Sequence, residues 1–588
     1  MTSRTLRVGP LSAVLDGVEL RWICYNDCEV LRGIYGSVRD DAWRTIPPKV
    51  KTAEIQQTSD RIDVRFRVDH SAEGIGFGWR GHVALTASGI VQYRFHGVAH
   101  RTFARNRIGL CVLHPISLAG TPVTITSVSG NRRAATFPEE IDPGSPFLDI
   151  AMMRWANHQM VATLEFVGDA FETEDQRNWA DASYKTFCTP LALPHPVTIA
   201  AGTRVAQGVT LRVKPINALT KRPRLARSRP ASTDVVSFDL AATRPMPELG
   251  TCLAPGHERL TDAQVAALAE LGFSSLRVVV DLSWRGWQDR LLAAASVASR
   301  VGSRLAVELV MDVGHVKLAE FVRLIGSLDT PPVHCLVFPA DGYATSASDV
   351  EHLRETVNAS GQSLLVGGGS RASFAELNRA ALPLEMLDLI GCPIASLVHA
   401  VDDATAMENI EALAHVVRGC LRASNGRPVI VGPVTLRPRY NAYGLQRASL
   451  GPESDSDRLD PRQQAPFAAT WTLAAVSELV TASAVILHEV SGPAGLLPEA
   501  DDPTGRSAYA AVRLLTSARP GRLVEAVSPA GMAAFGLTDG AAIRGFVANL
   551  TDRTRALDLR LAGDDDARCS VSTVVGPYGW TSVELPGQ

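Results

Sequence analysis

The chain has 588 residues, of which 46% are hydrophobic and 20% are charged, so it is too long for one core and is expected to form two to four globular domains. Its 58 basic and 61 acidic residues leave a formal net charge of -3, which argues against nucleic acid and anionic membranes as partners. No apolar run approaches the roughly 20 residues that cross a bilayer, and the amino terminus lacks the apolar segment of a signal peptide. We therefore expect a cytoplasmic protein.

The cysteines and histidines carry no recognisable cofactor signature. Nine cysteines are scattered along the chain, and only Cys24 and Cys28 lie near each other. No Cys/His array with zinc spacing and no H-E-x-x-H pair occurs, and no G-x-G-x-x-G fingerprint follows an early strand. We expect reduced thiols, no metal and no cofactor.

Short segments with period-two hydrophobicity fill the chain up to about residue 213. Ile62, Val64, Phe66 and Val68 alternate with polar residues, which is typical of strands. The pattern predicts an N-terminal antiparallel β-sandwich, assigned with its linker to residues 1–235. The basic, proline-containing stretch Lys221–Arg229 is interpreted as an interdomain linker.

Strand and helix patterns then alternate, which predicts a central (β/α)8 TIM barrel over residues 236–518. Thr261 and Gln264 form a capping box for the first helix, and Gly272 ends it. The eight expected strands are Leu249–Ala254, Ser275–Asp281, Arg304–Val310, Val333–Phe338, Ser363–Val366, Leu387–Ile390, Pro428–Val431 and Ala484–Leu487. Alternation returns near Arg522 and predicts a small C-terminal β-domain over residues 519–588.

The run from Glu172 to Phe187 concentrates charged and hydrogen-bonding groups around aromatic rings, as a site for a polyhydroxylated ligand would. An exposed ion-pair loop is the alternative interpretation. The candidate catalytic residues in this run are Glu172, Glu174, Asp175, Arg177, Asp181 and Lys185, and the candidate substrate-binding residues are Asn178 and Tyr184.

This run resembles a signature of the D-apionate lactonase family. Further resemblance lies in Glu29 to Asp41, Arg105 to Pro115, Gly367 to Ser370 with Glu376 to Arg379, and Thr435 to Asn441. The resemblance is therefore spread over most of the chain. It implies an enzyme that opens D-apionolactone to D-apionate in bacterial apiose breakdown, with a small sugar lactone as its partner.

Polar residues also follow the barrel strands, and barrel enzymes place their reacting groups at the carboxyl ends of strands. Of these residues, Glu489 is a catalytic candidate, whereas His399, Arg437, Arg439 and Asn441 are candidates for substrate binding, as is Glu308 just inside the end of its strand. Asp281, Asp312, Asp341, Asp402 and His488 occupy similar positions.

Lactone opening needs a base for water, donors for the oxyanion and an acid for the leaving oxygen. Glu489 or a carboxylate of the Glu172–Asp181 segment could be the base, and Arg177, Arg437 or Lys185 could hold the oxyanion. We expect Arg177 and Asp181 to join the barrel rim in one site. A serine nucleophile is disfavoured, because Gly367–Ser370 lacks the closing glycine of a nucleophile elbow and is interpreted as a strand-to-helix turn, with a phosphate cradle as the alternative.

Two rival functions remain compatible with this organisation. Many retaining glycosidases combine a TIM barrel with β-domains and need only two carboxylates, although no Asn-Glu pair ends the fourth strand here. A non-catalytic carbohydrate-binding protein would use the same rim residues as ligand contacts. A panel of lactones beside a panel of glycosides would separate these possibilities.

Overall fold

The computed structural model describes residues 3–72, 74–216, 234–440, 459–492, 494–497, 507–517, 521–540, 542–562 and 570–586. The expected linker and Asn441 lie outside these residues. The described chain divides into two compact units. We call the first the sandwich unit; it holds the described residues before Asn178 and those from Ala182 to residue 216. The second, the barrel unit, holds Asn178–Asp181 and the described residues from Asp234 onward.

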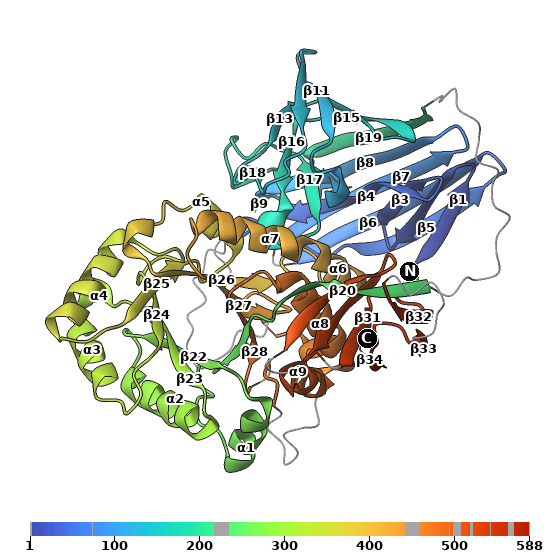
Figure 1. Ribbon diagram of the computed structural model, residues 1–588. Helices are drawn as coiled ribbons and strands as arrows, with labels where there is room; N and C mark the ends of the chain where they lie inside the picture. Colours follow the sequence, from blue (N-terminus) through green and yellow to red (C-terminus); the bar gives the residue numbers. More distant parts are fainter. Residues whose placement is uncertain are drawn as a thin grey trace. The chain divides into compact units, whose positions relative to one another are not determined.

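The sandwich unit consists of two large antiparallel sheets and a small two-stranded one (Figure 1). The first sheet has the order β1-β2-β3-β4-β10-β17-β16-β13, the second β12-β11-β14-β15-β19-β8-β7-β6-β5, and β18 pairs with β9. The strands are β1 Arg4–Val8, β2 Leu11–Asp16, β3 Glu19–Tyr25, β4 Cys28–Arg39, β5 Lys49–Gln57, β6 Arg61–Ala72, β7 Ile75–Thr86, β8 Ile90–Ala99, β9 Phe103–Arg105, β10 Arg107–Pro115, β11 Pro122–Thr126, β12 Arg132–Thr136, β13 Phe147–Ile150, β14 Met152–Ala156, β15 Met160–Val167, β16 Phe171–Asp175, β17 Ser183–Phe187, β18 Val197–Ile199 and β19 Arg204–Pro215.

Alternation along the strands gives each sheet one buried face. In β6, Ile62, Val64, Phe66 and Val68 are all buried, whereas the residues between them are exposed or half-buried. These side chains join one hydrophobic core that draws on both large sheets. The predicted strands and their inward-facing residues are therefore confirmed.

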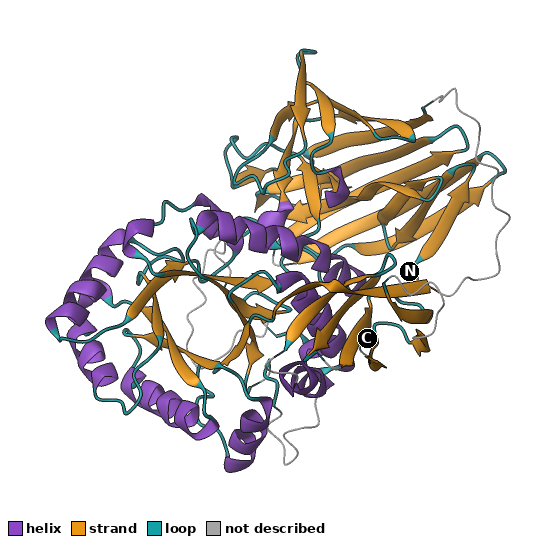
Figure 2. Cartoon of the chain, viewed as in Figure 1, coloured by secondary structure: helices purple, strands orange, loops and turns teal. Residues whose placement is uncertain are grey.

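The barrel unit contains a closed barrel of eight parallel strands, which confirms all eight predicted strands. Most of the strand residues are buried, because barrel strands are covered on both faces. Helices surround these strands in Figure 2. The strands are β21 Glu248–Cys252, β22 Ser275–Asp281, β23 Arg304–Val310, β24 His334–Phe338, β25 Leu365–Gly369, β26 Leu389–Ala395, β27 Val429–Thr435 and β28 Ala484–Glu489. The helices are α1 Asp262–Leu271, α2 Trp287–Val301, α3 Leu318–Gly326, α4 Ala347–Ala359, α5 Phe374–Arg379, α6 Asp403–Glu408, α7 Ile410–Ala423, α8 Pro466–Leu479 and α9 Ser507–Ser517.

The local sequence predictions for the barrel are confirmed at α1, whereas the turn predicted at the glycine run Gly367–Gly369 is not found. Thr261 and Gln264 make the predicted capping box, and Gly272 ends α1 in the left-handed conformation at φ 57°. Gly367–Gly369, in contrast, form the end of strand β25 rather than a turn. Close strand packing requires glycine here, since a Cβ on Gly369 would lie 2.1 Å from the carbonyl oxygen of Gly391 on the neighbouring strand.

A seven-stranded sheet completes the barrel unit, in the order β33-β32-β20-β29-β30-β31-β34. Its strands are β20 Asp234–Pro245, β29 Arg522–Val527, β30 Met532–Thr538, β31 Ala542–Asn549, β32 Arg555–Leu561, β33 Ser570–Val575 and β34 Trp580–Pro586. The predicted fold class, an N-terminal sandwich, a TIM barrel and a C-terminal β-domain, is thus confirmed. Residues 236–245, which the sequence assigns to the barrel domain, pair with β29 and β32 in this sheet. The domain boundaries stay a prediction.

No helix among the described residues is long and apolar enough to cross a membrane.

Candidate active site

The polar run from Glu172 to Phe187 is divided between the two units and is largely buried. It forms β16, a short 3-10 turn at Gln176–Trp179, and β17. Glu174 and Lys185 face each other in the register of the two strands and form an ion pair. Arg177 is fully buried against Asp175, with Nε 2.9 Å from Oδ1 and Nη2 2.6 Å from Oδ2.

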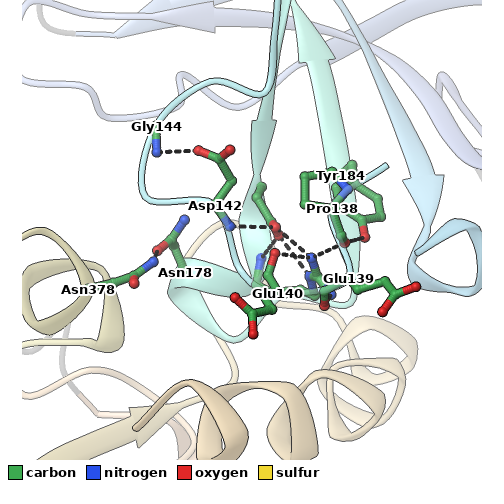
Figure 3. A network of polar contacts seen from close by, with 10 residues as sticks. Pro138, Glu139, Glu140, Asp142, Gly144, Asn178, Tyr184 and Asn378 are labelled. Atoms are coloured by element: carbon green, nitrogen blue, oxygen red, sulfur yellow. Dashed lines mark hydrogen bonds and ion pairs between the residues drawn. The ribbon is translucent and has the colours of Figure 1, made fainter. Parts of the chain in front are cut away.

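Backbone carbonyl groups of Pro138, Glu139 and Glu140, which are labelled in Figure 3, complete the surroundings of Arg177. Its guanidinium donates to the carbonyls of Pro138 at 2.8 Å and Glu139 at 3.0 Å. The Tyr184 hydroxyl donates to the Pro138 carbonyl at 2.5 Å, and Arg177 lies 4.7 Å from the centre of the Tyr184 ring. Arg177 therefore ties the segment around Pro138 to β16 and β17, all within the sandwich unit.

Glu172 has a separate environment in the same unit. One of its carboxylate oxygens accepts a hydrogen bond from the Leu191 amide at 2.9 Å. Partial burial raises the pKa of the Glu172 carboxyl. Of the eight candidates in the run, only Asn178 and Asp181 belong to the barrel unit.

Residues Asn178–Asp181 contact α5 and two further segments of the barrel unit, those around His399 and Asn409. The side-chain oxygen of Asn178 accepts from the Asn378 amide of α5 at 3.0 Å, a contact drawn in Figure 3. The Arg379 guanidinium lies 5.1 Å from the centre of the Trp179 ring. Ala180 has a φ of 60°, which is unusual for a residue with a Cβ and turns the chain sharply before Asp181.

Asp181 meets a histidine that follows strand β26. Oδ2 of Asp181 lies 2.6 Å from Nδ1 of His399, and the Trp179 ring meets the imidazole edge-on at 5.4 Å. Asn409, beside α7, donates to Oδ1 of Asp181 at 3.3 Å and to the Ser396 carbonyl at 2.6 Å. Asp181 is thus held by two donors, while 20% of the His399 side chain stays exposed.

This arrangement fixes the proton on one ring nitrogen of His399. Because a carboxylate accepts only, we assign the proton to Nδ1, which leaves Nε2 with a lone pair. Within the described part of the chain, Nε2 of His399 makes no hydrogen bond. A histidine oriented by a buried carboxylate in this way can act as a general base.

A second cluster lies inside the barrel around Glu308, on β23. The Glu308 carboxylate receives Nη2 of Arg439 at 2.8 Å and Nε of Arg371 at 3.3 Å. Arg371 also donates to the Tyr440 hydroxyl, and its guanidinium lies 4.4 Å from the centre of that ring. Arg371 follows β25 and Arg439 follows β27, the two strands that flank β26.

Electrostatics keep Glu308 ionised. Burial by itself raises the pKa of the Glu308 carboxyl, but the guanidinium groups of Arg439, Arg371 and Arg277 outweigh burial and lower the pKa to about 2. A carboxylate with so low a pKa is a weak base at neutral pH. Glu308 therefore serves to hold and orient cations.

Arg277, on β22, is the third cation near Glu308. It is 1% exposed, and its Nη1 donates to the Gly432 carbonyl of β27 at 2.8 Å. Its Nε and Nη2 have no hydrogen-bond partner among the described residues. Burial lowers the pKa of this guanidinium, and Glu308 acts in the opposite direction.

Glu489 stands at the carboxyl end of β28. Cys252 on β21 is paired with Arg277 on one side and with Glu489 on the other. Cys252 belongs to the cluster of apolar side chains inside the barrel, so Glu489 and Arg277 occupy one level of it. His488 just before has a φ of 51°, which breaks the alternation of β28 at this point.

The remaining rim candidates have local partners. His488 lies between Gln463 and Thr472 at 2.6 Å from each, and burial lowers its pKa to about 4. Arg437 pairs with Asp460 at 3.4 Å. Asp402 caps α6, Asp281 accepts from Ser283, Asp312 accepts from the Lys317 amide, and Asp341 is exposed. Over the described ranges, no group of three or more His, Cys, Asp or Glu side chains could hold a metal ion.

Comparisons with known proteins match this architecture. The family model described as "D-apionate lactonase, N-terminal domain" matches residues 1–216, and the one described as "D-apionate lactonase, TIM barrel domain" matches residues 249–520. The chain belongs to the D-apionate lactonase family. A D-apionate lactonase from Brucella anthropi is 30% identical over 526 residues, which cover 85% of this chain and 84% of that protein.

Two solved structures resemble this member of the D-apionate lactonase family remotely. A GH30 endoxylanase from Clostridium papyrosolvens C71 is 12% identical with a TM-score of 0.39, covering 60% of this chain and 97% of its own. AbfB, a family 51 alpha-L-arabinofuranosidase from Bifidobacterium longum, is 12% identical with a TM-score of 0.41, covering 60% of this chain and 100% of its own. Neither likeness bears on activity.

Sequence reasoning missed four residues of the site in this D-apionate lactonase family member: Arg277, Arg371, Tyr440 and Asn409. Arg277 carried a signal, because an arginine in the middle of an apolar strand must find an anion or several acceptors. Arg371 follows Ser370 at the end of the glycine run, and no local pattern marks it as a cation of the site. Asn409 carried no signal, since its role depends on Asp181, 228 residues away.

Proposed function

We propose that this chain hydrolyses the ring ester of a sugar-acid lactone, with D-apionolactone as the substrate and D-apionate as the product, in the bacterial breakdown of apiose. Membership in the D-apionate lactonase family supports the reaction. The hydrogen bond between Asp181 and His399 carries the mechanism, because it supplies an oriented base for water. A cytoplasmic location belongs to the same proposal, in keeping with the eight unpaired cysteines of the described chain.

The first step is attack by water on the lactone carbonyl. Nε2 of His399 takes a proton from the water molecule as its oxygen bonds to the carbonyl carbon. Asp181 keeps the imidazole in the required tautomer and stabilises the imidazolium that forms, as an orienting carboxylate does in hydrolase triads. Asn409 in turn fixes Asp181.

The second step breaks the ring. Arg371 and Arg439 are the proposed donors to the oxyanion, because Glu308 and Tyr440 hold both guanidinium groups in place before substrate arrives. The bond between the carbonyl carbon and the ring oxygen then breaks, and the imidazolium of His399 returns its proton to that oxygen as a hydroxyl. The new carboxylic acid ionises and releases one proton to solvent.

The other charged candidates have different roles in this proposal: two remain candidates for the site, and five have structural roles. Glu489 remains a candidate for proton transfer, because it shares a level of the barrel with Arg277. Arg437 remains a candidate for substrate binding. Glu172, Glu174, Asp175, Arg177 and Lys185 are left to the sandwich unit, where their hydrogen bonds and ion pairs hold strands and loops together.

Proton release by the purified protein tests this function. We expect D-apionolactone to be opened faster than other aldonolactones, with one proton released per ester bond, and aryl glycosides to be left intact. Turnover of aryl glycosides without lactone opening would contradict the proposal and favour the glycosidase alternative.

A further inference from the structure

The guanidinium of Arg277 is charged, buried and only partly satisfied. Its side chain is 1% exposed, and one of its three nitrogens donates to a backbone carbonyl. Nε and Nη2 find no acceptor in the described chain. Burying a charged group without hydrogen bonds is strongly unfavourable, so such a group is expected to have a partner in the functional state.

The two unpaired nitrogens are the pair that recognises a carboxylate. Nε and Nη2 lie along one edge of the planar guanidinium and can donate two parallel hydrogen bonds to two oxygens of one anion. Glu308 does not fill this role. Its two oxygens are taken by Arg371 and Arg439, and its influence on Arg277 is electrostatic.

The charged side chains at this level of the barrel also carry a net positive charge. Three arginines surround Glu308, and among the described residues the strand pairing places one further carboxylate, Glu489, at the level of Arg277. The five groups carry three positive and two negative charges, so one positive charge remains. A neutral lactone does not balance that charge, whereas its ring-opened product, a monoanion, does.

We propose that Arg277 forms a carboxylate-binding subsite inside the barrel, which takes the ring-opened, anionic form of a sugar acid. The inference rests on the proposed function for the identity of the ligand, but the subsite itself requires only an aldonate. Water adds to the lactone carbonyl, the ring C–O bond breaks, the ring oxygen leaves as a hydroxyl, and the carboxylate that remains binds to Nε and Nη2 of Arg277. The enzyme therefore binds its product through a contact that the neutral substrate makes only weakly.

Calorimetric titration of the full-length protein tests the subsite. The ligands are D-apionate, D-erythronate and D-gluconate, each beside its neutral alditol. We expect the wild type to bind at least one aldonate about tenfold or more tightly than its alditol, the size of one charge-assisted contact. Arg277→Gln should lose this preference, and Arg277→Lys should keep part of it, because lysine supplies a charge without the fork.

A matched control is Arg304→Gln, an exposed arginine at the start of β23 that pairs with Glu248. It should keep the full preference for the aldonate. If neither variant of Arg277 folds, the wild type labelled with 15N-arginine decides: an aldonate, but not its alditol, should shift a buried Nε–H resonance downfield. Equal affinity of the wild type for aldonates and alditols, absence of that shift, or full preference in Arg277→Gln would overturn the subsite.

Lactone turnover, measured on the same preparations, separates this inference from the proposed function. Turnover without preference for any aldonate would sink the subsite and leave the function standing. Preference for an aldonate that depends on Arg277, without turnover of any lactone, would support the subsite and contradict the proposed function.

Discussion

Nδ1 of His399 lies 2.6 Å from Oδ2 of Asp181, although 218 residues separate them in the sequence. Asp181 comes from the turn after β16, and His399 from the segment after β26. Both belong to the barrel unit, because residues Asn178–Asp181 are packed among α5, His399 and Asn409. The proposed base thus depends on Asn178–Asp181, four residues that lie between two segments of the sandwich unit in the sequence but belong to the barrel unit.

Removing either member of this pair should abolish most turnover. We expect His399→Gln and Asp181→Asn each to lower kcat by about 10²–10⁴-fold, because the first loses the proton acceptor and the second loses its orientation. The double variant should fall little further, since the two residues act as a unit. Steady-state proton release measures all three.

Controls for that experiment are His352→Gln on α4 and Asp552→Asn, both exposed in the barrel unit. They should keep kcat within about twofold, as surface changes usually do. Near-normal turnover in His399→Gln would remove this histidine from the mechanism.

Breaking the cation cluster should cost stability in a pH-dependent manner. Glu308→Gln leaves Arg371 and Arg439 without their carboxylate and should lower the free energy of unfolding by about 3–5 kcal/mol at neutral pH. The folded-state pKa of Glu308, about 2, lies below its ordinary value. Its contribution is therefore present above about pH 4.5 and is lost as pH falls toward 2.

Urea unfolding at pH 7, 5, 4 and 3 measures that dependence. The difference between the wild type and Glu308→Gln should be constant from pH 7 to 5 and shrink below. A difference that is the same at pH 3 and pH 7 would contradict the assigned ion pairs. Glu584→Gln, which breaks an exposed pair with Arg544, is the control and should show no such trend.

Arg177 gives a prediction about stability rather than chemistry. Arg177→Ala removes the guanidinium that pairs with the buried Asp175 carboxylate and donates to three backbone carbonyls, so we expect the free energy of unfolding to fall by about 3–5 kcal/mol. Thermal unfolding followed by circular dichroism measures the loss. If Arg177→Ala keeps its melting temperature and instead loses turnover, the oxyanion role expected from the sequence would replace the structural one.

Arg439 is expected to contribute to the transition state. Arg439→Gln should lower kcat by about 10²–10³-fold, the effect of losing one oxyanion donor, with a smaller change in KM. Turnover is normalised to the folded fraction, because Glu308 also loses a partner. Arg300→Gln, an exposed arginine of α2 that pairs with Asp262, should leave kcat unchanged. Equal kcat in both variants would exclude Arg439 as a donor.

The amino-acid sequence by itself determined the architecture and the kind of residue at the site. The eight barrel strands, the capping box at Thr261 and the alternation of β6 depend on neighbours in the chain, so periodicity and local hydrogen bonding reveal them. Position at a strand end, or just inside it for Glu308, also singled out Glu308, His399 and Arg439, because parallel strands of a barrel end on one rim.

Only the tertiary structure decided how the charged residues of the Glu172–Phe187 run are paired. Arg177 and Asp181 are four residues apart, yet one is closed in by Asp175 and the carbonyl of Pro138, and the other meets His399. The local sequence shows which residues are charged. Which partner each of them has depends on burial and on strands that are distant in the chain. Arg277 shows the same limit, since its unpaired nitrogens become visible only once the barrel has closed around them.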